Sequence, residues 1–239
     1  MNLRKRIGFH PLVVSLLLLS ASAAFATAPF PPFTAEFTLF RDNEQVGQSV
    51  IELKPHGNAE WLIETRTNAS LYTFNFSDRE QSRFRWLNGK PQPLAFEKER
   101  QRPGKTEIVH QRFDWQQMTD SGERGKKTWS TALTTGTQDL QSHLLLLQLD
   151  LRAGKRELNY PVSKNGRVRD YHYAVVKEEQ LETALGTLNV LRVERIRDPG
   201  DDRQTISWFA PTLDFLPVRI QQYEDGVQQG DMQIRKLSR

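Results

Sequence analysis

Between residues 180 and 226 the chain alternates strand-like runs with turn signals, and few folds accommodate that pattern. Within the runs, apolar side chains recur at every second position, as at Leu188 and Val190 and again at Ile206 and Trp208. A period of two places such residues on one face of a β-strand. The turn signals between the runs lie at Gly186, at Asp198-Pro199-Gly200 and at Asp225-Gly226. The region therefore predicts antiparallel strands with one buried face.

The first half of the chain continues this pattern. We count six or seven strands before residue 132, within residues 35–39, 46–54, 59–68, 84–87, 91–101, 106–115 and 126–131. Asn88-Gly89 is a strong hairpin signal between two of them. Residues 157–162 and 168–176 add two further strands. Because strands joined by short connections usually pair, we expect neighbours in sequence to be neighbours in the sheet.

One segment, Thr137–Gly154, has helical spacing instead. Leu140, Leu144, Leu147 and Leu151 form a continuous stripe, and Leu145, Leu146 and Leu149 widen it. We predict a helix at about residues 137–153 with Thr137 as N-cap, and full burial of Leu144 and Leu147. A helix so apolar must be covered on more than one side. The predicted fold is mostly β (α+β): a single curved antiparallel meander sheet, or unclosed barrel, wrapped around this leucine-rich helix.

Residues 1–28 have the features of a signal peptide. Arg4, Lys5 and Arg6 precede the apolar run Leu12–Leu19, and small residues allow cleavage after Ala26 or Ala28. The run is shorter than the roughly 20 residues of a membrane span, although a retained N-terminal anchor is the alternative. The chain has no cysteine, which excludes a lipoprotein signal. We expect a periplasmic protein in which residues 29–239 form a single β-rich domain with no transmembrane span.

The charge balance argues against a nucleic-acid partner. The chain has 33 Lys and Arg residues against 29 Asp and Glu residues. Removing Arg4, Lys5 and Arg6 with the signal peptide leaves 30 against 29, a net charge of +1. The basic run Lys98–Lys105 is interleaved with glutamates, which predicts a solvated strand face instead of a one-signed patch.

Catalytic and metal motifs are lacking in the sequence. There is no G-x-S-x-G nucleophile motif, and His56, His110, His143 and His172 are scattered without metal-ligand spacing. We therefore predict no catalytic residues, metal site or cofactor. If the sheet leaves a cavity against the helix, the residues expected to line it are Leu144, Leu147, His143 and Trp208. For His143 a hydrogen-bonded structural role is the alternative.

Two segments resemble a known family in the order and spacing of their motifs. The first is residues 136–154, with Asp139 and Ser142 ahead of the apolar helix. The second is residues 179–226, with Glu182, Gly186, Trp208 and Leu216-Pro217-Val218. They resemble the exported bacterial family called domain of unknown function 3108. The resemblance implies a periplasmic protein with no assigned activity. It also implies an architecture similar to the unclosed barrels of lipoprotein-carrier proteins, which hold an acyl chain between sheet and helix.

Structural roles can be assigned to these motif residues. Gly186 permits a positive φ between two strands, and Pro217 should open its strand or lie at an edge. Trp208 requires an acceptor for its N–H if buried. Asp139 and Glu182 would serve as ligands for a partner, or equally as a helix cap and a cross-strand ion pair.

Three functions remain open from the sequence. The first is a non-catalytic binding module for an apolar or amphiphilic envelope molecule. The second is a structural or adaptor protein of the envelope, which would have no cavity of about 300 Å³ or more. The third is a glycan- or peptidoglycan-acting hydrolase using two of Glu182, Glu194 and Asp170, which would need carboxyl groups about 5–9.5 Å apart.

Overall fold

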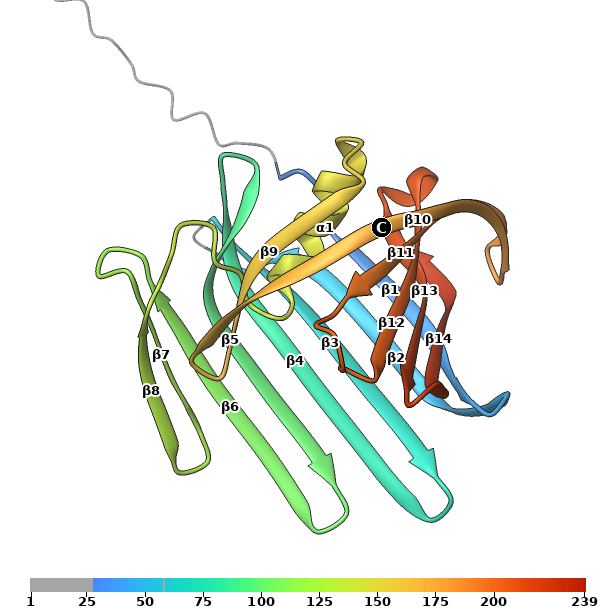
Figure 1. Cartoon of the computed structure of the whole chain (residues 1–239), viewed down its shortest axis with the longest axis horizontal. Coiled ribbons are helices and arrows are strands. Elements are labelled where there is room, and N and C mark those ends of the chain that lie inside the picture. The colour runs from blue at the N-terminus through green and yellow to red at the C-terminus, as the bar shows by residue number, and fades with distance from the viewer. Residues whose placement is uncertain (1–27, 58) are drawn as a thin grey trace, which may run out of the picture.

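The computed structural model describes residues 28–57 and 59–239. The predicted signal peptide, residues 1–28, lies outside the described residues except for its last position. Eight strands precede the helix (Figure 1): β1 Phe33–Arg41, β2 Glu44–Pro55, β3 Glu60–Leu71, β4 Phe74–Leu87, β5 Lys90–Arg102, β6 Lys105–Asp114, β7 Thr119–Arg124 and β8 Lys127–Ala132.

The helix α1, Ser142–Arg152, is followed by six more strands and a short 3-10 turn, Pro211–Leu213. The strands are β9 Glu157–Lys164, β10 Arg167–Thr183, β11 Gly186–Ile196, β12 Arg203–Ala210, β13 Leu216–Glu224 and β14 Val227–Ser238. In the described chain all fourteen strands belong to one sheet, ordered β8-β7-β6-β5-β4-β3-β2-β1-β14-β13-β12-β11-β10-β9. Each neighbouring pair is antiparallel. The predicted fold class is confirmed.

One strand of the first half was not predicted. Strand β7 has the sequence TDSGER, which contains no apolar side chain, so periodicity gives no signal there. Its pairing with β6 and β8 in tight hairpins defines it instead. Strands that are adjacent in sequence pair as expected, except β8 and β9, which lie on either side of the helix in the chain and do not pair. In addition, the first strand, β1, pairs with the last, β14.

The helix begins at Ser142, five residues later than predicted. Thr137 does not cap it, because its hydroxyl donates a hydrogen bond back to the carbonyl oxygen of Thr134, 2.8 Å away. Gln138 forms an isolated parallel bridge with Val162 of β9. The backbone before Ser142 is thus tied to the sheet edge and cannot join the helix.

The two edges of the sheet, β8 and β9, approach each other without a hydrogen-bonded ladder. Side chains join them: the hydroxyl of Thr131 on β8 donates to the carbonyl oxygen of Gly166, 2.9 Å away, in the turn after β9. The amide of Gln111 donates to Asp120 at 2.8 Å and to Ser163 of β9 at 3.0 Å. All three of these polar side chains are buried. The barrel is therefore unclosed in its backbone and bridged by side chains.

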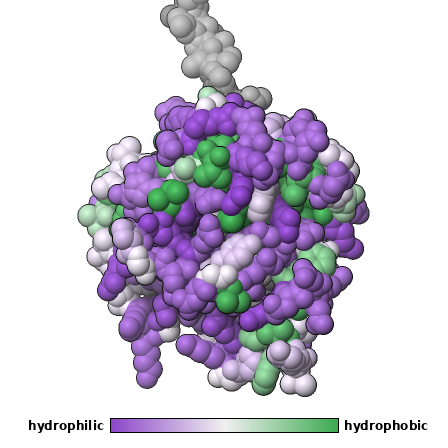
Figure 2. Space-filling view, turned by 45° about the vertical axis from the view of Figure 1, so that its right-hand side comes forward, coloured by the Kyte–Doolittle hydropathy of each residue, from purple (hydrophilic) through white to green (hydrophobic). Residues whose placement is uncertain are grey.

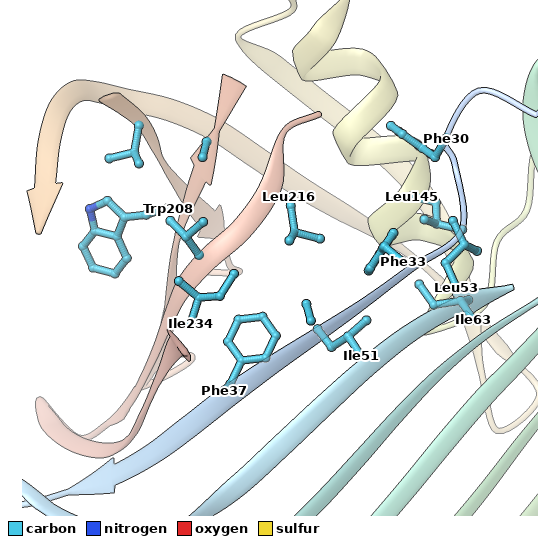
Figure 3. Close-up of a cluster of buried hydrophobic side chains, with 14 of the residues drawn as sticks. Phe30, Phe33, Phe37, Ile51, Leu53, Ile63, Leu145, Trp208, Leu216 and Ile234 are labelled. Atoms are coloured by element: carbon cyan, nitrogen blue, oxygen red, sulfur yellow. The ribbon is translucent and has the colours of Figure 1, made fainter. Parts of the chain in front are cut away.

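The helix lies against the concave side of this sheet and contacts β5 and β9 (Figure 1). Figure 3 shows Leu145 reaching toward Phe33, Leu53 and Ile63 on the first three strands. Leu145 is fully buried, and Leu147 is 1% exposed. Burial of such side chains contributes roughly 1.5–3 kcal/mol each, so the helix is a main element of the core.

The orientation of the helix corrects part of the leucine prediction. Leu144 is only partly buried, whereas Gln141 and Gln148, which flank the leucine stripe beside Leu144, are each 4% exposed. Coverage of the helix therefore extends past the edge of the stripe to these two polar side chains, while Leu144 within the stripe is left partly exposed.

The surface gives no sign of a large apolar face in the view of Figure 2, where hydrophilic residues dominate and hydrophobic ones form small separate groups. In the described part of the chain, no helix has the length and apolar character needed to cross a membrane.

Candidate functional site

A cavity of about 500 Å³ lies between the N-terminal end of α1 and the concave face of the sheet. Its volume is within the range of small-molecule sites. Residues from seven neighbouring strands, β5-β4-β3-β2-β1-β14-β13, and from the start of the helix line it. The apolar part of the lining includes Leu39, Ile51, Leu144, Ile220 and Met232, and the polar part includes Thr65, Thr67, Asp78, Glu80, Arg100 and Gln141.

The strand register explains why the cavity has one apolar and one polar wall. One row of paired residues crosses the sheet from Ile51 on β2 to Thr65 on β3, then to Glu80 on β4 and Lys98 on β5. Paired positions in an antiparallel sheet present their side chains on the same face. The concave face therefore changes from aliphatic to charged over four strands, and a bound molecule would contact both an aliphatic and a charged surface.

Four charged side chains form an ionic cluster: Asp78, Glu80 and Arg100, which line the polar wall, and Lys98 behind them. Lys98 Nζ pairs with Glu80 and lies 3.6 Å from Asp78 Oδ2. Arg100 Nε donates to Asp78 Oδ2 at 2.6 Å. The opposed charges make the burial of each group tolerable, because attraction offsets part of the loss of hydration.

The helix end completes this cluster. The amide nitrogen of Gln141 donates to Glu80 Oε2 at 2.9 Å, and its oxygen accepts from the hydroxyl of Thr65 at 3.0 Å. Burial raises the pKa of Glu80, but the Lys98 ammonium and the Gln141 amide outweigh that effect and leave the pKa below its usual range. For Asp78, burial dominates and raises the pKa above the usual value of the carboxyl.

The ionic cluster corrects the prediction for the basic run after residue 97. We expected Lys98–Lys105 to lie on a solvated face, yet the Lys98 side chain is only 11% exposed. Lys98 and Arg100 share the parity of buried Phe96, whereas Glu97 and Glu99 point the other way. The signal in the sequence was that Lys98 and Arg100 have the same parity along the strand as the buried Phe96, which indicates that they face the interior. Interleaved charges on one strand concealed it, since a polar run usually marks a solvated face.

Of the four residues expected to line a cavity, Leu144 does so. Leu147, His143 and Trp208 pack elsewhere in the core. The described structure thus does not bring the four together.

His143 is buried in a hydrogen-bonded environment. Its Nδ1 lies 3.1 Å from the carbonyl oxygen of Asp139, which can only accept, so Nδ1 carries the proton and donates. Nε2 then accepts from the hydroxyl of Tyr173, 2.9 Å away. Burial lowers the pKa of His143 to about 4. A neutral imidazole with both nitrogens occupied holds the helix to β10.

Trp208 is 7% exposed and lies beside Arg219, whose guanidinium carbon is 5.3 Å from the ring centroid. Its indole N–H donates to Glu179 Oε1 at 2.8 Å. The acceptor that a buried indole requires comes from the long hairpin β10–β11, which Figure 1 shows arching away from the rest of the sheet.

The motif residues Asp139 and Ser142 cap the helix reciprocally. Asp139 Oδ1 accepts from the backbone N–H groups of Gln141 and Ser142, at 2.7 and 2.8 Å. The hydroxyl oxygen of Ser142 accepts from the Asp139 N–H at 2.9 Å. Asp139 Oδ2 accepts from the hydroxyl of Ser82 on β4, at 2.5 Å. Burial raises the pKa of Asp139 to about 6. Asp139 therefore both caps the helix and anchors its N-terminal end to the sheet.

The other motif residues lie away from the cavity. Glu182 accepts a hydrogen bond from the hydroxyl of Thr187 at 2.6 Å across the exposed β10–β11 hairpin. Gly186 has a φ of 100°, which favours glycine. Pro217 is the second residue of β13.

The carboxylates considered for hydrolysis are also outside the cavity lining. Asp170 and Glu182 are twelve residues apart on β10, and Glu194 pairs with Arg192 at 2.6 Å. Among the described residues, no group of three or more His, Cys, Asp or Glu side chains is arranged to hold a metal ion.

The two ends of the space under the helix differ. Near the helix C-terminus, where Arg152 lies over the ring of Phe30, there is an aromatic cluster: Phe30, Trp61 and Phe84 surround Trp86, with ring centroids 5.0–6.3 Å from the Trp86 ring. At the other end the cavity reaches the β3–β4 turn, where Tyr72 is 93% exposed and Phe74 is 52% exposed. A polar hollow of about 390 Å³ adjoins this end. The cavity lining includes none of these four aromatic residues and extends to the β3–β4 turn instead.

Comparison with known proteins places the fold. A search of curated proteins finds no match. Among solved structures, the chain is similar to a β-barrel-like protein of domain of unknown function DUF1849 from Brucella abortus, with a TM-score of 0.58 and 14% sequence identity. The similarity covers 87% of this chain and 97% of the other. A family model described as protein of unknown function (DUF3108) matches residues 34–234. The chain belongs to the DUF3108 family.

Proposed function

We propose that this protein is an exported, non-catalytic binding module that holds an amphiphilic molecule in the cavity beneath α1. The observation that carries the proposal is the cavity itself: about 500 Å³ with an aliphatic wall facing a charged wall. An acyl or other apolar chain fits against Leu39, Ile51 and Met232. A polar headgroup would find hydrogen-bond partners on the opposite side.

A structural or adaptor role is the second candidate. It needs no cavity of ligand size, since the helix alone would fill the sheet. The volume under the helix N-terminus exceeds the roughly 300 Å³ that separates the two candidates, which favours binding.

Export is part of the proposal and rests on the sequence of residues 1–28. Cleavage after Ala26 or Ala28 would leave Phe30 in place, which is 2% exposed and packs against Trp86. N-terminal sequencing of the protein from the periplasm should therefore start at Thr27 or Pro29. A periplasmic product that retains Met1 would contradict the export proposal.

Binding is tested with dodecyl maltoside below its micellar concentration, by isothermal titration and by thermal shift. A ligand at a hundredfold excess over its Kd should stabilise the native state by roughly 2.7 kcal/mol. The substitution Leu144→Trp fills the cavity from the helix side and should abolish this effect. Ile108→Trp is the matched control, because Ile108 is 45% exposed and does not line the cavity.

Each outcome of these binding experiments either supports or overturns the proposal. Binding by the native protein and Ile108→Trp but not by Leu144→Trp supports the cavity as the site. Equal binding by all three proteins would place the ligand elsewhere and overturn the proposal. No binding of dodecyl maltoside, nor of a matched dodecyl phosphate, would favour the adaptor role.

A further inference from the structure

A second, smaller pocket adjoins the cavity behind the ionic cluster. Its volume is about 120 Å³, and it lies among β5, β6, β7 and the β9–β10 turn. Four basic side chains line it, together with a single carboxylate, Glu107; the four are Lys98, Arg100, Arg124 and Lys164. We call it the basic pocket. Arg100 lines both spaces, so the basic pocket and the cavity share a wall.

The charges of the basic pocket do not balance. Asp78 and Glu80 pair with Arg100 and Lys98 from the cavity side, and Glu107 lies 3.6 Å from Arg124. Three carboxylates thus face four cations. Lys164 carries the surplus, because it forms no ion pair with any residue in 28–57 or 59–239. Burial and the nearby Lys98 ammonium lower the pKa of Lys164, as expected for a cation without a counter-charge.

The pocket also has a composition suited to one class of anion. Two guanidinium groups present rigid forks of N–H donors, and two ammonium groups add rotatable ones. A carboxylate has only two acceptor oxygens, whereas a phosphate ester has three, each of which accepts strongly from such donors. The side chain of Gln111 also lines the pocket and adds polar surface.

We propose that the basic pocket binds a phosphate group. The group is the headgroup of the amphiphile whose apolar part occupies the adjoining cavity, or a free phosphate ion. The first of these rests on the proposed function above. The helix N-terminus fits this division, because Leu140 lines the basic pocket while Gln141 and Leu144 line the cavity.

Three probes separate the two sources: inorganic phosphate, dodecyl phosphate and dodecyl maltoside, titrated calorimetrically against the full chain. The native protein should bind dodecyl phosphate roughly tenfold or more tightly than dodecyl maltoside, since hydrogen bonds to charged groups are strong. Lys164→Gln should remove most of that advantage and leave the affinity for dodecyl maltoside unchanged. Lys164 as a residue is exposed at the end of β9, although part of its side chain is buried in the basic pocket, so the variant should fold.

Lys90→Gln is the control, because Lys90 is also an exposed lysine of the sheet but does not line the basic pocket. Equal affinities for both dodecyl probes, or an equal loss in the two lysine variants, would overturn the phosphate site and leave the cavity proposal standing. Lys164-dependent binding of inorganic phosphate with no binding of either dodecyl probe would support the phosphate site and overturn the cavity proposal. Failure of all three probes would overturn both.

Discussion

Replacing Asp139 by alanine tests whether one buried carboxylate fixes the helix over the cavity. The carboxylate is fully buried and accepts three hydrogen bonds: from two backbone N–H groups of the helix start and from the hydroxyl of Ser82. A buried donor left without its partner costs about 1–3 kcal/mol. With two backbone donors and one hydroxyl orphaned, Asp139→Ala should lower the free energy of unfolding by about 3 kcal/mol or more.

Asparagine at the same position distinguishes hydrogen bonding from charge. Asp139→Asn keeps an acceptor oxygen for the two N–H groups and removes the buried charge. Because the folded pKa of about 6 lies above the unfolded value near 3.8, the native protein loses stability as pH rises from about 4 to 6. The variant should lack this loss, so its stability relative to the native protein should improve by up to about 3 kcal/mol between pH 4 and pH 7.

Urea denaturation at both pH values measures these differences. If Asp139→Ala costs less than about 1 kcal/mol, or if the asparagine and alanine variants lose equal stability, the buried cap does not hold the helix and the reasoning fails.

Three further changes follow from the same structure, each read by chemical denaturation. Gly47→Ala should be strongly destabilising, because its Cβ would lie 2.1 Å from a backbone oxygen of β3, whereas Gly230→Ala meets nothing within 4 Å and serves as control. Because burial depresses the folded pKa of His143 to about 4, the native protein should lose up to roughly 3 kcal/mol of stability as pH falls from 6.5 to 4. His143→Gln should remove this loss, and an unchanged pH profile in the variant would refute the reasoning. Leu147→Ala should cost about 2–5 kcal/mol and Leu144→Ala clearly less, and equal costs would contradict the observed helix orientation.

Local pattern alone was sufficient for most strands and for the existence of the helix. The period of two along β12, with Ile206 and Trp208 buried, reports a one-sided strand whatever it pairs with. The leucine spacing likewise reports a helix. Neither pattern marks where α1 begins, because Thr137–Gln141 is shaped by hydrogen bonds to Thr134, Pro161 and Ser163 and not by its own propensity.

The candidate site could be predicted only in part. Leu144 was identified from the leucine stripe, but Asp78, Glu80, Lys98 and Arg100 were not. Charged residues within a strand predict a solvated face, unless a neighbouring strand supplies the opposite charge at the paired position. That pairing depends on register between strands joined by turns of unknown geometry.

The sequence by itself determined most of the strands, most of their buried faces and the existence of the helix that the sheet must cover, because each depends on residues within a few positions of one another. Only the tertiary structure decided that β1 pairs with β14, that the barrel stays unclosed between β8 and β9, and that an ionic cluster faces an aliphatic wall beneath the helix. These features join segments as much as about 200 residues apart. Their free energy comes from contacts between distant positions, which no local periodicity encodes.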